Sequence, residues 1–321
     1  MVRYKTFVNV MTMALIMIFT GWFTESCTRG NNGGEDQSKV NEIEVAESGS
    51  GAVSSGLSGK VNGGSNDNDP NLKSYQYKYD KQTDYEDGRF DNDPDYIAIP
   101  CKLRGKPEQL LFRKGYAVSY NESTKQANWV CWHLTRSHTY GDVPRPQRAF
   151  HDDDDVSNST HYWDYDKSRE YDRGHMCPAA DNRWDSDAMM ESFLMSNVCP
   201  QYRHLNSGVW NDIEIKCREW AKNIGDVYIV CGPVFNDNGS SREYIGESRI
   251  PVPDAFFKVV VSNHGKGKGI GFLCPNRSGS DDLNDYSVSI DDVEKVTGID
   301  FFPALPDEME ERIESEVGNW W

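Results

Sequence analysis

The sequence predicts an α+β domain, with a mixed, mainly antiparallel sheet core and flanking helices, over residues 96–321. Three observations lead to this class. Short runs rich in β-branched and aromatic residues alternate with turns, few segments have helical spacing, and the 321 residues show no internal repeat. Hydrophobic residues make up 37% of the chain and charged residues 26%, which excludes a disordered, collagen-like or multi-span membrane protein.

The predicted strands are four short β-rich runs bounded by turns: 128–134, 226–230, 256–261 and 269–273. The strongest predicted helix is 207–223, because apolar residues recur there every three or four positions and Gly225 follows as a stop. Three weaker helices are expected, the last two of them acidic and on the surface: 187–194, 291–297 and 307–317.

The first 27 residues predict export. Two basic residues precede an apolar run of 17 residues at 7–23, which is short for a bilayer span and suits a signal peptide. Cys27 follows as in a bacterial lipoprotein signal, where this cysteine is lipidated after cleavage. Plain secretion with Cys27 free or paired, and an uncleaved anchor, are the alternatives. Any membrane association would then come only through this N-terminal anchor.

Residues 28–95 predict a flexible acidic tether, because they are rich in Gly, Ser, Asn and Asp and lack apolar periodicity. The tether has 14 acidic against 7 basic residues, and 96–321 has 36 against 25, within a total net charge of −17. The predicted domain is therefore itself acidic and shows no basic footprint for nucleic acid. It would bind a polyanion with a shallow salt dependence unless a local groove gathers its arginines.

The segment Asp172-Arg173-Gly174-His175 brings an acid, a guanidinium and an imidazole together within four residues. Histidine is the side chain best suited to accept a proton near neutral pH, and the planar arginine fork suits phosphate oxygens. We expect Gly174 to let the backbone bend sharply there. A hydrogen-bonded surface histidine is the alternative for these residues alone.

Two downstream segments, 196–201 (SNVCPQ) and 205–210 (LNSGVW), add Asn197 and Asn206, and Glu214 follows. Asn206 and Glu214 are eight residues apart, or ~12 Å along a helix. This spacing suits an amide oxygen on Mg²⁺ and a carboxylate that holds the ion's waters. A helix N-cap is the alternative role for Asn206.

Together these segments resemble the DNA/RNA non-specific endonuclease family, the ββα-metal nucleases, through D-R-G-H-M-x-P, S-N-x-x-P-Q and L-N-x-G-x-W-x-x-x-E. Later stretches also read like this family, so the resemblance spans roughly residues 96–318: 227–235, 250–260, 272–276 and 297–302. The resemblance implies an embedded ββα-metal motif. It also implies metal-dependent hydrolysis of DNA and RNA that leaves 5′-phosphate ends.

By this resemblance, His175 is the general base that activates water. Asn206 is the direct metal ligand, Glu214 holds a metal-bound water, and Asn197 lies in the active site. The implied metal is Mg²⁺, for which Mn²⁺ can substitute.

The resemblance also implies two arginines that contact phosphate. Arg173 is the first, and Arg148, in an Arg-Ala-Phe sequence ahead of acidic residues, is the candidate for the second, with Arg136 as the next choice. Asp172 is expected to be structural. The carboxylates at 152–155 are expected in a solvated loop rather than in a Ca²⁺ site.

The proposed chemistry does not need the cysteines of this chain. No two cysteines form C-x-x-C, and in an exported protein some should form disulfides. Cys177 and Cys199 each precede proline within the motifs and are candidates to pair with each other, with zinc binding as the alternative.

Two other functions remain open: a phosphodiesterase with a narrowed substrate, and a silent nucleic-acid-binding surface protein.

Overall fold

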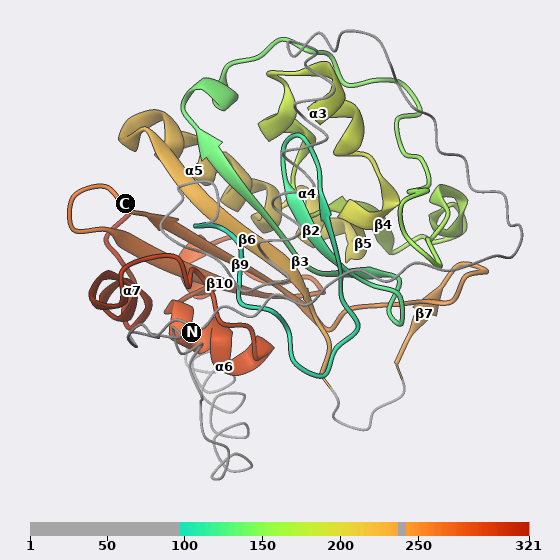
Figure 1. The fold of residues 1–321 in the computed structure, drawn as a ribbon. Helices are drawn as coiled ribbons and strands as arrows, with labels where there is room; N and C mark the ends of the chain where they lie inside the picture. The colour runs from blue at the N-terminus through green and yellow to red at the C-terminus, as the bar shows by residue number, and fades with distance from the viewer. Residues whose placement is uncertain (1–96, 237–241, 321) are drawn as a thin grey trace, which may run out of the picture. The chain divides into compact units, whose positions relative to one another are not determined.

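The central sheet has seven strands and is antiparallel at every hydrogen-bonded pair, which confirms the predicted class. The computed structural model describes residues 97–236 and 242–320; the predicted signal peptide (1–27) and tether (28–95) lie outside the described residues. Across the sheet the strands are β1 Gln109–Phe112, β2 Ala117–Asn121, β3 Gln126–Thr135, β6 Asp226–Val234, β9 Ala255–Ser262, β10 Lys268–Pro275 and β11 Ser287–Val288 (Figure 1).

The four predicted strands are confirmed as the long strands β3, β6, β9 and β10, each longer than predicted, with β6 extended by four residues. Both faces of this sheet are buried, because side chains alternate between two cores. Along β9, Phe256 and Val260 lie in the core on one face, and Phe257 and Val259 lie in the core on the other.

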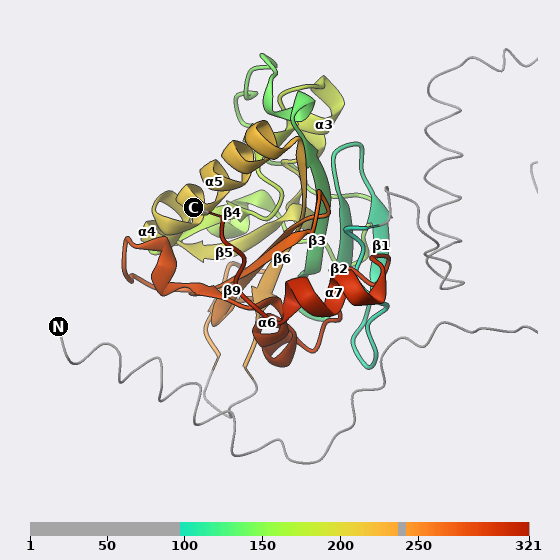
Figure 2. The same cartoon turned by 90° about the vertical axis from the view of Figure 1, so that its left-hand side faces the viewer.

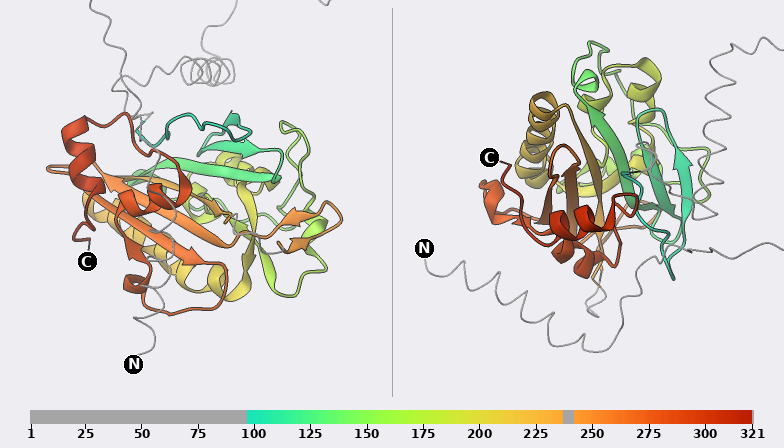
Figure 3. Two further views of the ribbon diagram at one scale, coloured as in Figure 1. Left: turned by 90° about the horizontal axis from the view of Figure 1, so that it is seen from below. Right: turned by 60° about the vertical axis from the view of Figure 1, so that its left-hand side comes forward.

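Helices cover both faces of the sheet. The helix α5 (Val209–Ile224) packs on one face, whereas α6 (Ile290–Thr297) and α7 (Asp307–Glu314) pack on the other (Figures 2 and 3). The predicted stop of α5 is confirmed, since Gly225 caps it with a φ of +129°. The other helices are α3 Ser186–Glu191, α4 Arg203–Ser207 and the 3₁₀ turns η2 Ser137–Thr139, η3 Tyr162–Tyr165, η4 Ala179–Asn182, η5 Met195–Asn197 and η6 Leu283–Asp285.

A second, two-stranded sheet pairs β4 (Tyr171–His175) with β5 (Val198–Tyr202), and α4 and α5 follow β5 directly. This succession forms the predicted ββα unit. It packs against the central sheet because the residues that follow β4 lie in the same core as β3 and α5. A third small sheet consists of β7 (Tyr244–Ile245) and β8 (Ile250–Pro251).

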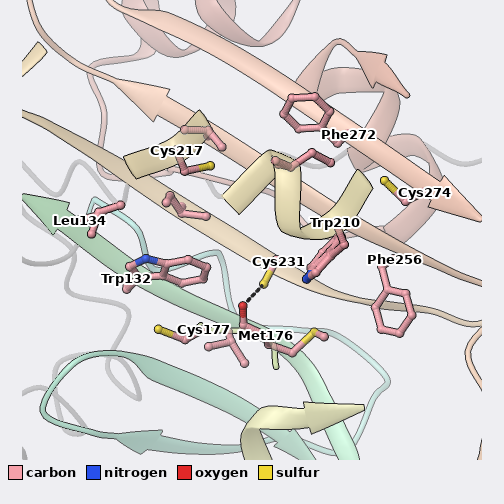
Figure 4. Packing of buried hydrophobic residues seen from close by; sticks show 14 of the residues in the cluster. Trp132, Leu134, Met176, Cys177, Trp210, Cys217, Cys231, Phe256, Phe272 and Cys274 are labelled. Atoms are coloured by element: carbon pink, nitrogen blue, oxygen red, sulfur yellow. Dashed lines mark hydrogen bonds between the residues drawn. The ribbon is translucent and has the colours of Figure 1, made fainter. Parts of the chain in front are cut away.

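The core between α5 and the sheet is rich in sulfur and indole groups (Figure 4). Trp210 is only 1% exposed there. The predicted pairing of Cys177 with Cys199 is wrong, because both thiols are free and buried. Burial raises the pKa of both thiols well above the usual value, so they behave as packing groups. In the described part of the chain Cys101 is disulfide-bonded, and the free thiols include Cys177, Cys199, Cys217, Cys231 and Cys274.

Across residues 97–236 and 242–320, no helix combines the length and apolarity needed to cross a bilayer.

Candidate active site

The ββα unit brings the three sequence motifs together. The strand β4 carries Asp172, Arg173 and His175, and its antiparallel register places His175 opposite Val198 at the start of β5. The short helix α4 then carries Asn206, and α5 carries Glu214 on its second turn. Residues from separate segments of the chain therefore lie around one hairpin and the two helices that follow it.

Gly174 serves close packing and not the sharp bend that we expected. It lies inside β4, opposite Cys199, and does not have a positive φ. A Cβ added to Gly174 would lie 2.5 Å from the Cβ of the fully buried Gln201. The glycine therefore allows the two strands to lie close together beneath His175.

Gly174→Ala is expected to force β4 and β5 apart. The methyl group cannot fit without a backbone shift, so the free energy of unfolding should fall by ~1–3 kcal/mol, measured by urea denaturation. Gln201→Gly, added to the same chain, removes the colliding side chain and should recover part of the loss. A fully stable Gly174→Ala single variant would contradict this packing.

His175 ends β4 in an aromatic setting. Its ring centroid lies 5.1 Å from that of Phe150 and 5.0 Å from that of Phe193. Its Nε2 is buried and has no hydrogen-bond partner among the described residues. Burial, helped by the positive charge of Arg145, lowers the pKa of His175 to about 3. The imidazole is therefore neutral at physiological pH, and burial makes it a weaker base than a solvated histidine.

The lowered pKa of His175 predicts an acid-sensitive contribution to stability. An unfolded imidazole binds a proton near pH 6.5, whereas the folded site keeps His175 neutral down to about pH 3. The contribution is complete above pH 6.5 and is lost as the pH falls toward 3, by at most ~1.4 kcal/mol per pH unit. Urea unfolding at about pH 7, 6 and 5 measures this effect. Between about pH 7 and 5 the free energy of unfolding should fall less for His175→Asn than for the wild type. Equal losses would contradict a buried neutral imidazole.

Two arginines lie beside this histidine. Arg173 donates through Nε and Nη2 to the carbonyl of Tyr162, at 2.9 and 2.6 Å, and pairs with Asp166. The guanidinium of Arg145 lies 4.9 Å from the ring centroid of Phe193. It also lies 5.9 Å from the ring centroid of Phe150, so that Arg145 and His175 contact the same two rings.

Arg148, the predicted second arginine, lies two residues before Phe150 in the same loop as Arg145. Arg148 is exposed with a φ of +53°, and within the described ranges no hydrogen bond, ion pair or ring contact joins it to the other candidate residues. Arg136 lies at the far end of α5, where its Nη2 donates to the carbonyl of Asn223 at 3.3 Å. The sequence pattern pointed to Arg148 and not to Arg145, which precedes it by three residues and lies over the rings of Phe150 and Phe193.

Asp172 connects two neighbours on α4. It accepts hydrogen bonds from Nε of Arg203 at 3.1 Å and from Nδ2 of Asn206 at 3.4 Å. This contact orients the amide of Asn206, whose Oδ1 has no hydrogen bond among the described residues. The N-cap alternative for Asn206 is wrong, because α5 begins after Gly208.

Asn197 is fully buried, and its amide is engaged by backbone. Its Oδ1 accepts from the N–H of Cys177, and its Nδ2 donates to the carbonyls of Cys177 and Ser192, all at 2.8–2.9 Å. The side chain therefore fixes the turn after His175 and keeps no free polar atom for a substrate.

The carboxylate run at 152–155 is solvated only in part, because Asp154 and Asp155 are exposed as expected but Asp153 is buried. Asp153 is 2% exposed, accepts from Nη2 of Arg113 with both oxygens at 2.8 Å, and also accepts from the hydroxyl of Ser196. These bonds tie the loop that carries Phe150 to the segment beside Asn197.

Glu214 faces a buried lysine that the sequence reasoning overlooked. Lys258 of β9 is fully buried, and its Nζ lies 3.9 Å from Oε1 of Glu214 and 4.1 Å from the ring centroid of Trp210. Burial raises the pKa of Glu214 to about 7 although Lys258 opposes this. Burial lowers the pKa of Lys258, but Glu214 and other acidic groups hold it above its usual value. The alternation along β9 could have indicated that this lysine is buried, because Lys258 lies between Phe256 and Val260, which share its face of the sheet.

The oxygen donors suit a hard divalent cation. The free amide oxygen of Asn206 and the carboxylate of Glu214, whose side chain is 12% exposed, are ligands that Mg²⁺ accepts directly or through water. The residues present therefore fit the metal that the resemblance implies.

The known proteins that this chain resembles include mitochondrial nucleases. Nuclease EXOG, mitochondrial, of Danio rerio is 34% identical over 219 residues, which cover 63% of this chain and 64% of that protein. Endonuclease G, mitochondrial, of Bos taurus is 33% identical over 209 residues, covering 61% of this chain and 70% of that protein. The chain spans 56–64% of the length of the EXOG relatives that it matches.

A solved structure and a family model agree with these relatives. The crystal structure of an EndoG/EndoGI complex, which concerns the mechanism of EndoG inhibition, superposes with a TM-score of 0.58 at 28% identity, covering 63% of this chain and 89% of that chain. The model of the DNA/RNA non-specific endonuclease family matches residues 94–308, which include the whole ββα unit. With that match and the geometry of β4, β5, α4 and α5, the chain belongs to the DNA/RNA non-specific endonuclease family.

Proposed function

We propose that this protein is a metal-dependent endonuclease that hydrolyses phosphodiester bonds of DNA and RNA. The observation that carries the proposal is the neutral imidazole of His175, whose Nε2 has no hydrogen-bond partner among the described residues. The two rings that contact it also contact the guanidinium groups of Arg145 and Arg173. Asn206 and Glu214 lie on the two helices that follow the same hairpin. Membership of the family supports the same reaction class.

In the proposed mechanism His175 accepts a proton from the attacking water. The rings of Phe150 and Phe193 hold the imidazole in place and keep it neutral. A phosphodiester is already anionic, so the arginines act by binding its oxygens and offsetting the charge that builds up during attack. We expect 5′-phosphate ends, and little base preference because such contacts go to phosphate and sugar.

Of the upstream arginines, Arg148 stays the proposed second phosphate contact, and Arg145, whose guanidinium lies over the rings of Phe150 and Phe193, is a further candidate. Arg173 is already held by Tyr162 and Asp166, so it would contact phosphate from a fixed position. Asn197 would act indirectly, because its amide group fixes the backbone that follows His175.

Asn206 and Glu214 would hold Mg²⁺, the first directly and the second through water, and Mn²⁺ should substitute. A bound divalent ion would neutralise phosphate charge and stabilise the leaving oxygen. Asp172 supports this binding because it holds the amide group of Asn206.

We propose that the protein is exported. A lipid on Cys27 would anchor it to the cell envelope, and secretion or a periplasmic location is the alternative. The proposal rests on the sequence of residues 1–27, with two basic residues, a 17-residue apolar run and a cysteine behind it. Mass spectrometry of the protein from its native membrane fraction would show or exclude a lipidated Cys27.

Incubation of the full chain with supercoiled plasmid and with RNA, in Mg²⁺ and in EDTA, tests the activity. Cleavage of both polymers only with metal supports the proposal. Cleavage of a dinucleotide but not of polymers would favour the narrowed phosphodiesterase, which the net charge of −11 over residues 96–321 favours. Binding without cleavage of any phosphodiester would favour the silent surface protein.

A further inference from the structure

Three carboxylates converge on the side of the sheet away from α5. Asp291 and Glu294 belong to α6 and Glu314 ends α7, and each offers an oxygen within 4.8 Å of the others. The apolar residues of α6 and α7 pack in the core on the opposite face from the residues around Glu214. This group, which we call the α6–α7 carboxylate cluster, is therefore separate from the proposed active site.

Glu314 is buried in this cluster without a compensating partner. It is 7% exposed, and its Oε1 is buried and receives no hydrogen bond from the described residues. Beyond burial, the largest electrostatic influences on it come from four carboxylates: Asp291, Glu294, Asp300 and Glu310. A carboxylate in such surroundings needs either a proton or a cation.

The nearby basic side chains are engaged elsewhere. Lys295, next to Glu294 on α6, pairs with Asp292 at 3.1 Å, and Arg312 on α7 donates to the carbonyl of Lys266. Lys295 acts on Glu294 only through its charge, and within the described ranges neither Lys295 nor Arg312 forms an ion pair with a carboxylate of the cluster.

The spacing of the cluster fits one hard cation. Ligands of a single Ca²⁺ lie ~2.3–2.6 Å from the ion, so that two of them are at most ~5 Å apart. The three oxygens meet this limit at 4.8 Å. Ca²⁺ accepts many carboxylate oxygens in flexible geometry, whereas Mg²⁺ keeps several of its waters.

We propose that Asp291, Glu294 and Glu314 bind a calcium ion that joins α6 to α7. Glu294 also accepts a hydrogen bond from the N–H of Phe301 at 2.8 Å through Oε1, so the ion would link both helices to the segment between them. The bound ion stabilises the C-terminal part of the fold and takes no part in phosphodiester hydrolysis.

Thermal unfolding of the EDTA-treated full chain, with and without added Ca²⁺, tests this site. The background variant Asn206→Ala removes the proposed direct ligand of the catalytic metal and so weakens binding there, and the variants of the cluster then show which site gives the response. In that background saturating Ca²⁺ should raise the melting temperature by about 5 °C or more, and calorimetry should show about one ion bound.

Glu314→Gln and, on the surface side, Asp291→Asn should each abolish the Ca²⁺ response. The matched control is Glu311→Gln on the exposed side of α7, which should keep the full response. The proposal is overturned if Ca²⁺ leaves the melting temperature unchanged, or if Asp291→Asn responds as fully as Glu311→Gln. It is also overturned if Glu314→Gln raises the melting temperature in EDTA and the wild type binds no Ca²⁺, because the cluster would then hold a proton. These readouts are independent of nuclease activity.

Discussion

His175→Ala is expected to lower the rate of plasmid and RNA cleavage by ~10²–10⁴-fold. The variant loses the imidazole that the structure holds neutral and without a partner at Nε2, and no other histidine lies against Phe150 and Phe193 in the described ring contacts. Single-turnover cleavage at saturating Mg²⁺ measures the chemical step and separates it from substrate binding.

The matched control is His264→Ala, which removes a half-exposed imidazole that pairs with Asp226. It should keep nearly the full rate, and circular dichroism should show that both variants are folded. A folded His175→Ala protein that retains more than about one tenth of the rate would assign the general base to another group.

The long strands were predictable because both faces of the sheet are buried. Strands β3, β6, β9 and β10 therefore read as nearly continuous apolar runs. The edge strands β1 and β11, of four and two residues, are too short to give such a signal. Strand β4 was missed because its charged residues and Gly174 have low β-propensity, which pairing with β5 overrides.

The residues of the candidate site could be predicted where they belong to recognisable sequence motifs. The D-R-G-H segment, Asn206 and Glu214 occupy one ββα unit, as the motifs predicted. The break at Gly208 was not predicted, so the two-turn helical spacing of Asn206 and Glu214 does not describe their positions. The placement of Arg145 depends on the path of a loop, and the contact of Lys258 with Glu214 joins β9 to α5, so neither could follow from local sequence.

Lys258→Met is expected to lower the free energy of unfolding by ~3–5 kcal/mol. The substitution keeps the apolar contacts of the side chain with Trp210 but removes the cation that lies 3.9 Å from Oε1 of Glu214. The carboxylate is then buried without a positive neighbour at that distance. Its protonation would relieve part of the cost, and the protein would then lose the negative charge that we assign to metal binding.

A double-mutant cycle with Glu214→Gln isolates this interaction. Because Lys258→Met and Glu214→Gln each leave one buried partner uncompensated, the double variant should be more stable than the sum of the single losses predicts, by ~1–3 kcal/mol. The control Lys295→Met removes an exposed ammonium paired with Asp292 and should cost no more than ~0.5 kcal/mol. Urea unfolding gives the stabilities, and Mn²⁺ titration of the folded variants gives the metal affinity. A coupling below ~0.5 kcal/mol with unchanged metal affinity would show that Lys258 is only a packing residue, since a lysine that holds Glu214 ionised must affect both measurements.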